Sequence, residues 1–464
     1  MSDVPAESGP LAPGSWKILS VAILGSFLSN LDATIVNVSL SSLASDLHTA
    51  LGTIQWVTSG YLLALTLILP LNGWLVDRIG AKALYLWCFS AFTLSSALCG
   101  LAWSAPSLIG FRILQGLAGG LLAPMAQMMI ARVAGKQMAR VAGYATLPIL
   151  LAPLLGPVIA GAILQYASWR WLFLVNVPVG VLAIALAALF LPSDRDERRP
   201  RELDLQGLAL LSPALVLFLY GADRVGEPMG LSLFLLSLVL LAAFFWTALR
   251  KGKRALIDLQ LFRSPLFSIA SIAQFLSNGT TFAGQMLIPL YLIDAAGRSP
   301  GEMGWLMAPL GLGMLCTFPS MGFLTKHLGT RGVAAGGALL ATLATAAFIY
   351  LSAYELNLAV LAAALFLRGV GLGGVGIPSM TAAYSSVPRS DLPMATTTLN
   401  IVQRLGGPSL TTLCATFLGW QLSSYHAGQS GPTPYMWAFA LLCGLHAATL
   451  LAALGFPARA QRAG

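Results

Sequence analysis

Two residues of opposite charge lie within long apolar stretches of the sequence, and they are the residues best placed to do chemistry. Asp32 stands about fifteen residues after Lys17, so on a helix it lies roughly 22 Å further along the axis. Arg112 lies about six residues into an apolar stretch that runs in the opposite direction to the one containing Asp32. On helices, the depths of the two residues would differ by roughly one and a half turns. A carboxyl group at such a depth is costly and is by default a functional candidate.

The chemistry that this pair suits is the binding and release of a proton. An arginine is always charged and lowers the proton affinity of a nearby carboxyl group, whereas desolvation raises that affinity. A conformational change that alters their separation or hydration therefore changes the affinity, as proton coupling requires. The alternative is a static buried ion pair that only fixes packing.

Polar residues surround Asp32 on a helical wheel. At about 100° per residue, Ser29, Asn30, Thr34 and Asn37 fall outside the narrow apolar sector of this helix. A helix so polar must line a wet cavity or lie among other helices. The residues expected in a substrate cavity are Asn30, Thr34, Asn37, Gln115, Asn278, Asn400 and Gln403.

A short loop between apolar segments, GWLVDRIGAK at Gly73–Lys82, has the composition of a gate contact. Gly80 follows Asp77 and Arg78 at a point where a positive φ is easily adopted. Asp77 could meet a positive helix N-terminus across an interface and so favour one state of a gate. We therefore take Gly73, Asp77, Arg78 and Gly80 as a candidate latch, the alternative being a solvated basic loop.

The segment APLLGPVIAG at Ala152–Gly161 combines small residues with a helix-bending residue. Pro157 removes a backbone hydrogen bond, while Gly156 and Gly161 allow close helix packing. Packing alone could explain this segment.

The elements that must position these residues are membrane-spanning helices. Of 464 residues, 57% are hydrophobic and 9% are charged, against about 25% charged in soluble domains. Apolar runs of about 20 residues, long enough to cross a bilayer, recur from end to end. We predict an all-α membrane protein with fourteen transmembrane helices, at about 16–42, 54–76, 81–103, 106–130, 140–165, 168–191, 206–222, 229–249, 266–292, 301–324, 332–352, 356–380, 393–420 and 434–456.

Charge supports this count. With both termini cytoplasmic, twenty of the 26 Lys and Arg residues fall on the cytoplasmic side, three fall outside and three lie within helices. The net charge of +9 is thereby explained by topology, and we expect no nucleic-acid partner. The first fifteen residues lack the features of a cleaved signal, so the first helix is expected to stay in the cell membrane.

The two halves of the chain resemble each other at a nearly fixed offset. FLSN occurs at Phe27–Asn30 and Phe275–Asn278, and GWLVDRIGAK corresponds to GFLTKHLGTR at Gly322–Arg331. Arg112 corresponds to Arg368. We therefore expect a cytoplasmic tail (1–15), a six-helix bundle (16–191), cytoplasmic linkers (192–265) with an inserted helix pair (206–249), a second six-helix bundle (266–456) and a tail (457–464).

Other chemistry is not indicated. The five cysteines have neither CxxC nor metal spacing, and the four histidines are scattered, so we expect no metal, no cofactor and no disulfide framework. No nucleotide-binding loop or catalytic triad pattern occurs, so the chain is not expected to be an enzyme.

Five segments in order resemble the major facilitator superfamily, specifically its fourteen-helix drug:proton antiporter branch. They are LDATIVNV at Leu31–Val38, GWLVDRIGAK, RILQGLAGG at Arg112–Gly120, APLLGPVIAG, and WRWLFLVNVPVG at Trp169–Gly180. The resemblance implies a monomeric two-bundle transporter in which Asp32 is the proton-linked acid and Arg112 its modulator. It also implies that Asp77 and Arg78 form the gate latch, and that Gly156 and Pro157 form a hinge or a leak-proof packing surface.

The leading functional hypothesis is a proton-coupled exporter of hydrophobic, often cationic drugs that works by alternating access. Its partners would be a small-molecule substrate, protons and the lipid bilayer. An alternative is a dedicated exporter of one metabolite, peptide, lipid or organic acid, because three intramembrane arginines beside one acid leave room for neutral or anionic substrates. A hypothesis from another class is a membrane sensor or scaffold that does not transport.

Overall fold

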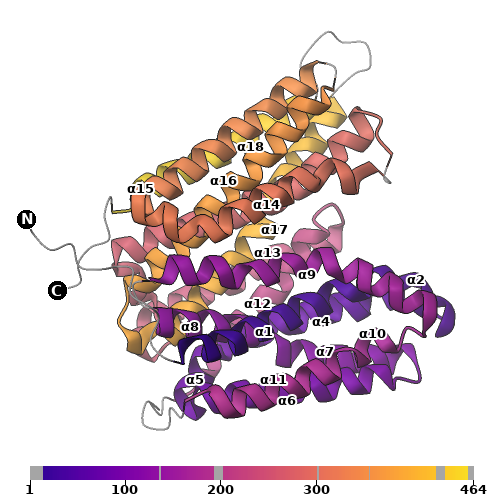
Figure 1. Ribbon diagram of the computed structural model, residues 1–464, viewed down its shortest axis with the longest axis vertical. Helices are drawn as coiled ribbons and strands as arrows, with labels where there is room; N and C mark the ends of the chain where they lie inside the picture. Colours follow the sequence, from indigo (N-terminus) through magenta and orange to yellow (C-terminus); the bar gives the residue numbers. More distant parts are fainter. Residues whose placement is uncertain are drawn as a thin grey trace, which may run out of the picture.

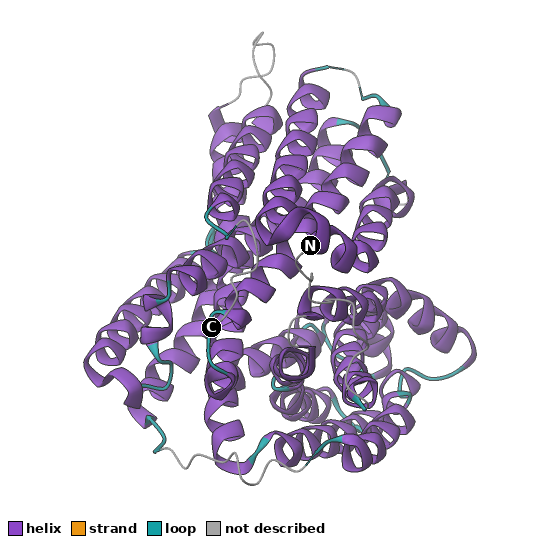
Figure 2. Ribbon diagram, turned by 60° about the vertical axis from the view of Figure 1, so that its left-hand side comes forward, coloured by secondary structure: helices purple, strands orange, loops and turns teal. Residues whose placement is uncertain are grey.

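The computed structural model describes residues 14–134, 137–192, 202–299, 302–354, 356–424 and 434–457. Across these ranges the chain folds into helices joined by short loops, without any strand (Figure 2). Ten of the helices in these ranges are long and apolar enough to cross a membrane. The protein is therefore a multi-pass helical membrane protein.

The predicted apolar segments of the first half lie mainly in helix, and several of them are interrupted. The first segment changes from α-helix to a 3-10 turn at Val36, and the fourth is divided at Gly120 and Leu121. The elements are α1 (Ser15–Ile35), η1 (Val36–Ser39), α2 (Leu40–Asp46), α3 (Leu51–Ile54), α4 (Trp56–Ile68), η2 (Leu69–Leu71), α5 (Asn72–Ile79), α6 (Ala81–Gly100), α7 (Ala105–Gly119), α8 (Leu122–Ala134), α9 (Met138–Tyr166), α10 (Trp171–Leu174) and α11 (Asn176–Phe190).

The rest of the chain continues the same pattern. The elements are α12 (Leu205–Asp223), α13 (Pro228–Lys251), η5 (Gly252–Arg254), η6 (Leu259–Arg263), α14 (Pro265–Leu290), the π-helical turn η7 (Tyr291–Ala295), α15 (Met303–Ala353), α16 (Leu358–Ser385), η9 (Arg389–Asp391), α17 (Leu392–Ser424) and α18 (Pro434–Leu454). Helix α15 comprises two helices that meet at Gly329, where the backbone is not helical.

Helices of the same half of the chain pack mainly with one another. Helix α1 contacts α8, α9 and α11, and α7 lies between α4 and α6 (Figure 1). In the second half, α15 and α18 pack together, as do α14 and α17. Helix α12 pairs with α13 and also contacts α4 and α17, so it bridges the two halves of the chain.

The internal repeat is visible in the backbone. Gly80, between α5 and α6, has φ 89° and ψ 155°, and Gly329, inside α15, has φ 70° and ψ 167°. These two glycines occupy corresponding places in GWLVDRIGAK and GFLTKHLGTR. Residues with a side chain rarely adopt this conformation, so both halves use glycine for the same sharp turn.

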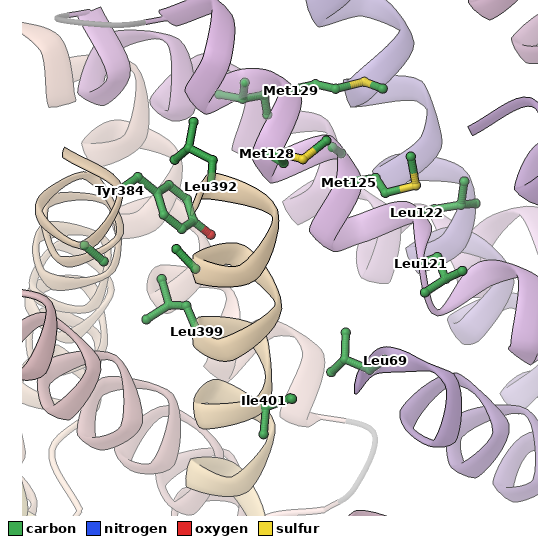
Figure 3. Packing of buried hydrophobic residues seen from close by; sticks show 14 of the residues in the cluster. Leu69, Leu121, Leu122, Met125, Met128, Met129, Tyr384, Leu392, Leu399 and Ile401 are labelled. Carbon is green, nitrogen blue, oxygen red and sulfur yellow. The ribbon is translucent and has the colours of Figure 1, made fainter. Parts of the chain in front are cut away.

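The halves meet along a seam at one end of the molecule, the left end of Figure 1, where α5 and α8 lie. Helix α17 packs against both α5 and α8, and α15 packs against α9. Every residue of α17 from Leu392 to Ile401 is buried. Figure 3 shows this part of α17 between Tyr384 of α16 and the methionines Met125 and Met128 of α8, all within one buried apolar cluster.

Candidate functional site

Asp32 and Arg112 form a direct ion pair at the centre of the candidate site. Nη1 of Arg112 lies 2.6 Å from Oδ2 of Asp32, and both side chains are 0% exposed. The sequence predicts that they lie at similar depths, and the structure brings them into direct contact. Helix α7 presents Arg112 because it begins at Ser104, whose side chain forms a capping box with Ser107 and fixes the first turn.

Two amides complete the shell around the carboxylate. Nδ2 of Asn176 donates to Oδ1 of Asp32 at 2.7 Å, and Nε2 of Gln115 donates to the same oxygen at 3.1 Å. Both amides also donate to the hydroxyl of Ser96, at 3.2 and 3.1 Å. Helices α1, α6, α7 and α11 thus converge on one buried carboxyl group, which accepts hydrogen bonds from three side chains.

The guanidinium of Arg112 is fixed on its other sides as well. Its Nε donates to the Val57 carbonyl of α4 at 3.1 Å, and its Nη1 donates to Oε1 of Gln115 at 2.8 Å. The ring of Tyr61 lies 4.1 Å from the guanidinium carbon, within cation–π range. Tyr61 in turn donates to the Ser29 carbonyl of α1 at 3.3 Å. A change in this site is therefore transmitted to α1, α4 and α7 together.

Sequence reasoning missed Asn176 and Ser96. Asn176 begins α11 within the quoted segment WRWLFLVNVPVG, and it is 1% exposed. The available signal was an amide in an otherwise apolar run, since buried polar groups require partners. Ser96 is a small hydroxyl in a helix rich in serine, and nothing in its local sequence distinguishes it.

Gln115 and Asn400, which were predicted to line the substrate cavity, are both buried between helices in this structure. Gln115 is 0% exposed and belongs to the shell of Asp32 rather than to a cavity wall. Asn400 is buried in the seam, where its Nδ2 donates to Oε1 of Gln127 at 2.8 Å. Residue type and helix position do not reveal which neighbour covers an amide, and the assignment of both residues to a substrate cavity stays a prediction.

The predicted cavity residues Asn30, Thr34, Asn278 and Gln403 are partly exposed. Asn30 donates to the Ser26 carbonyl of its own helix at 2.7 Å, and Gln403 donates to Oε1 of Gln274 at 3.0 Å. Asn278 is half-buried in α14. The side chain of Asn37 lies outside the described part of the structure.

Gly156 joins α9 to the site. A Cβ at this position would lie 2.4 Å from Oγ1 of Thr34, so only glycine allows this approach of α9 to α1. Thr34 also donates to the Ala152 carbonyl of α9 at 3.3 Å. A Cβ at Gly161 would meet nothing within 4 Å, so this glycine makes no comparable close approach. The side chain of Pro157 lies outside the described residues.

The candidate latch reaches the second half through its first residues. Asn72 donates to Oγ1 of Thr397 at 3.0 Å, and a Cβ at Gly73 would lie 3.5 Å from the Cα of Met394. Asp77 is half-buried at the end of α5. Arg78 is exposed and lies over the ring of Trp74, 5.7 Å from its centroid. Asn72, which the sequence did not single out, carries the contact across the seam.

Other ionisable groups lie outside this site. Among the described residues, His, Cys, Asp and Glu nowhere form a cluster of three or more. Asp223 pairs with Arg224 at 3.3 Å on the surface, and Asp294 accepts a hydrogen bond from Tyr435 at 3.0 Å.

Comparisons with known proteins identify the family of this chain. Residues 22–410 and 271–462 match the Major Facilitator Superfamily. The "Multidrug resistance protein B homolog" of Mycobacterium tuberculosis is 31% identical over 418 residues, covering 88% of this chain and 77% of its own. The "Putative multidrug resistance protein MdtD" of Pectobacterium carotovorum is 34% identical over 339 residues, covering 72% of each chain.

A solved structure shows the same fold. The human transporter MFSD10, described as an organic anion transporter, superimposes with a TM-score of 0.64 at 16% identity, covering 95% of this chain and 100% of its own. That identity is low enough that the likeness concerns the fold alone. On the family match and the relatives together, this multi-pass membrane protein belongs to the Major Facilitator Superfamily of transporters.

Proposed function

We propose that this protein exports hydrophobic small molecules, drugs among them, in exchange for protons. The observation that carries the proposal is the buried carboxylate of Asp32, paired with Arg112 and linked through it to α4. Protonation of Asp32 removes the negative charge that holds Arg112 in place. Binding of the proton would therefore change the interactions of α1, α6, α7 and α11 together.

The free energies of the buried ion pair and of proton movement across the membrane are suitable for energy coupling. Breaking a buried ion pair by removing one charge costs about 3–5 kcal/mol. A proton that crosses the membrane potential releases roughly 2.3 kcal/mol per 100 mV. The two quantities are comparable, so binding and release of one proton is enough to shift a two-state equilibrium substantially.

The seam suggests how access alternates. We place both termini in the cytoplasm, with fourteen helices crossing the cell membrane as two six-helix bundles (16–191 and 266–456) and an inserted pair. The seam formed by α5, α8 and α17 then closes the cytoplasmic side, so this structure corresponds to an outward-facing state. Rocking of the two bundles would separate the seam and open the cytoplasmic side, with the protein acting as a monomer.

The remaining motif residues take supporting roles in this proposal. Gly73, with its neighbour Asn72, forms the cytoplasmic latch against α17, and Gly80 makes the turn that positions it. Asp77 and Arg78 belong to the same loop. Gly156 allows α9 to pack closely against α1, so that water stays excluded from the proton site between conformational changes.

The test uses everted membrane vesicles that carry the protein and an imposed pH gradient. Wild-type protein is expected to accumulate a fluorescent hydrophobic dye and to lose that accumulation when an ionophore collapses the gradient. Asp32→Asn keeps the shape but cannot cycle a proton, so gradient-driven uptake is expected to fall at least tenfold. Dye-induced proton release from purified protein is expected to vanish with it.

Asp223→Asn is the matched control, because it makes the same chemical change at an exposed surface pair. This variant should transport like wild type. Uptake by wild type that ignores the gradient, or uptake by Asp32→Asn with a normal pH dependence, would contradict the proposal.

A further inference from the structure

Arg112, Arg368 and Arg404 lie deep within apolar helices, and the first two each make several polar contacts. Arg112 is neutralised by Asp32. Arg368 of α16 is 1% exposed and donates to three neutral acceptors within the second half. These acceptors are Oγ1 of Thr345 at 2.8 Å, Nε2 of His446 at 3.0 Å and the Thr280 carbonyl at 2.8 Å.

Arg404 of α17 differs from both. Among the described residues, its side chain makes one hydrogen bond, from Nη1 to Oγ1 of Thr66 in α4 at 3.4 Å, close to the limit for such a bond. Within the described part of the chain, no carboxylate forms an ion pair with it. A guanidinium carries five donors and stays charged in proteins, so most of its hydrogen-bonding capacity is unused.

Arg404 lies where α17 changes from fully buried to half-buried in the seam. Residues 392–401 of α17 are buried on every face, whereas residues 402–405 are half-buried. Arg404 lies on the face of α17 that meets α4, because it contacts Thr66 there. It is therefore the first charged group beyond the closed part of the seam, between the two halves.

The groups around Arg404 are neutral amides or belong to the proton site. One turn earlier, Asn400 pairs with Gln127, and Gln403 pairs with Gln274. Tyr61, whose ring stacks on Arg112, is also within electrostatic range of Arg404. Asp32 and Arg112 cancel each other, so this region keeps one positive charge.

We propose that Arg404 binds an anionic group, most simply a carboxylate, on the transported compound. This inference rests on the proposed export function and narrows its substrate class to hydrophobic organic anions and zwitterions. A partly buried guanidinium without a counter-ion is costly, and a carboxylate can satisfy it through two parallel charge-assisted hydrogen bonds. A purely cationic compound would instead meet a net positive charge at this point, contrary to the cationic substrates expected from the sequence.

The experiment compares two xanthene dyes that share a core and differ in charge, anionic fluorescein and cationic rhodamine 6G. Uptake into everted vesicles under the same pH gradient gives a fluorescein-to-rhodamine ratio for each variant. Loss of one charge-assisted contact in Arg404→Gln is expected to lower this ratio about tenfold or more. Arg404→Lys keeps the charge without the planar fork and should retain part of the ratio.

Arg224→Gln is the matched control, since Arg224 lies at the exposed end of α12 beside Asp223. Its ratio should equal that of wild type. In parallel, fluorescein should raise the melting temperature of purified wild type and of Arg224→Gln, but not that of Arg404→Gln.

Three outcomes overturn the inference: an unchanged ratio in Arg404→Gln, an equal loss of both dyes, or wild type that neither transports fluorescein nor is stabilised by it. Equal loss would mark Arg404 as a structural contact of the seam. If gradient-driven rhodamine uptake persists in any of these cases, the export function still stands. Conversely, stabilisation by fluorescein without gradient-driven uptake of either dye would contradict the export function and leave the anion site supported.

Discussion

Asp32 shows how a single residue acquires a role from its surroundings. A carboxylate that is 0% exposed persists in an apolar bundle because Arg112, Gln115 and Asn176 supply its donors. Its hydrogen bonds connect residues 80, 83 and 144 positions apart in the chain. Removing any of these partners leaves a buried charge undersatisfied, so the site is sensitive to small changes.

A second carboxylate, Asp204, offers a residue-scale prediction outside the membrane-spanning segments. Burial alone would raise the pKa of Asp204, but Lys251 at 2.5 Å and the backbone N–H groups of Gly207 and Leu256 outweigh burial and lower it. Because the folded-state pKa is below the unfolded value of about 3.9, this carboxylate stabilises the fold above about pH 4. The stabilisation is lost as the pH falls through the folded-state pKa.

Asp204→Asn is therefore expected to lower the free energy of unfolding by about 1–3 kcal/mol at pH 7. Denaturant unfolding of purified protein in detergent, at pH 7 and near pH 3, measures the difference between variant and wild type. That difference should shrink at the lower pH. A difference that stays constant with pH would show that the ionised carboxylate is not the stabilising group.

At the scale of elements, α17 is a helix whose polarity suits contact with other helices rather than lipid. It carries three consecutive threonines, Thr396 to Thr398, all buried and all bonded to carbonyls one turn earlier. Although it is 33 residues long, it is not among the ten helices with the apolarity of a membrane span. A threshold on mean hydropathy thus misses a polar helix that is surrounded by other helices and not by lipid.

The contact between α1 and α9 gives a prediction at this scale. Gly156→Ala places a Cβ 2.4 Å from Oγ1 of Thr34, so α9 must move away from α1. We expect a loss of about 1–3 kcal/mol in stability, typical of overpacking, and several-fold slower dye uptake. Thermal unfolding and vesicle uptake provide the two measurements.

Gly161→Ala is the matched control on the same helix, because a Cβ there meets nothing within 4 Å. It should be neutral or slightly stabilising, since alanine favours helix over glycine. Equal effects of the two substitutions would contradict the packing role assigned to Gly156.

At the scale of the whole molecule, the seam closes one end between helices that lie far apart in the sequence. Asn72 and Thr397, which are hydrogen-bonded, are 325 residues apart, and Gln127 and Asn400 are 273 residues apart. Each contact involves a few polar groups set in an apolar cluster. Such an interface can separate without leaving many buried polar groups unpaired.

Cross-linking the seam should therefore stop transport. In a background with the exposed Cys316 changed to serine, Gly73→Cys with Met394→Cys places two thiols within disulfide reach, because a Cβ at Gly73 lies 3.5 Å from the Cα of Met394. Oxidation is expected to abolish dye uptake, and a reductant to restore it. Each single-cysteine variant should transport throughout. Full uptake by the oxidised double variant would mean that this seam stays closed during transport.

The sequence by itself determined where helices lie and which of them carry charge. Apolar runs, turn residues and the 1.5 Å rise of a helix are local properties, so the helical segments, the glycine turn at Gly80 and the shared depth of Asp32 and Arg112 could all be predicted.

Only the tertiary structure decided which faces meet. A helical wheel locates polar residues without naming the neighbour that each one contacts. The sequence therefore could not assign Asn176 and Ser96 to the shell of Asp32, or place Asn400 in the seam. Nor could it distinguish Arg404, which lacks a carboxylate partner among the described residues, from Arg112. The physical reason is that ion pairs and hydrogen bonds act over a few ångströms, and folding brings together residues that lie tens to hundreds of positions apart in the chain.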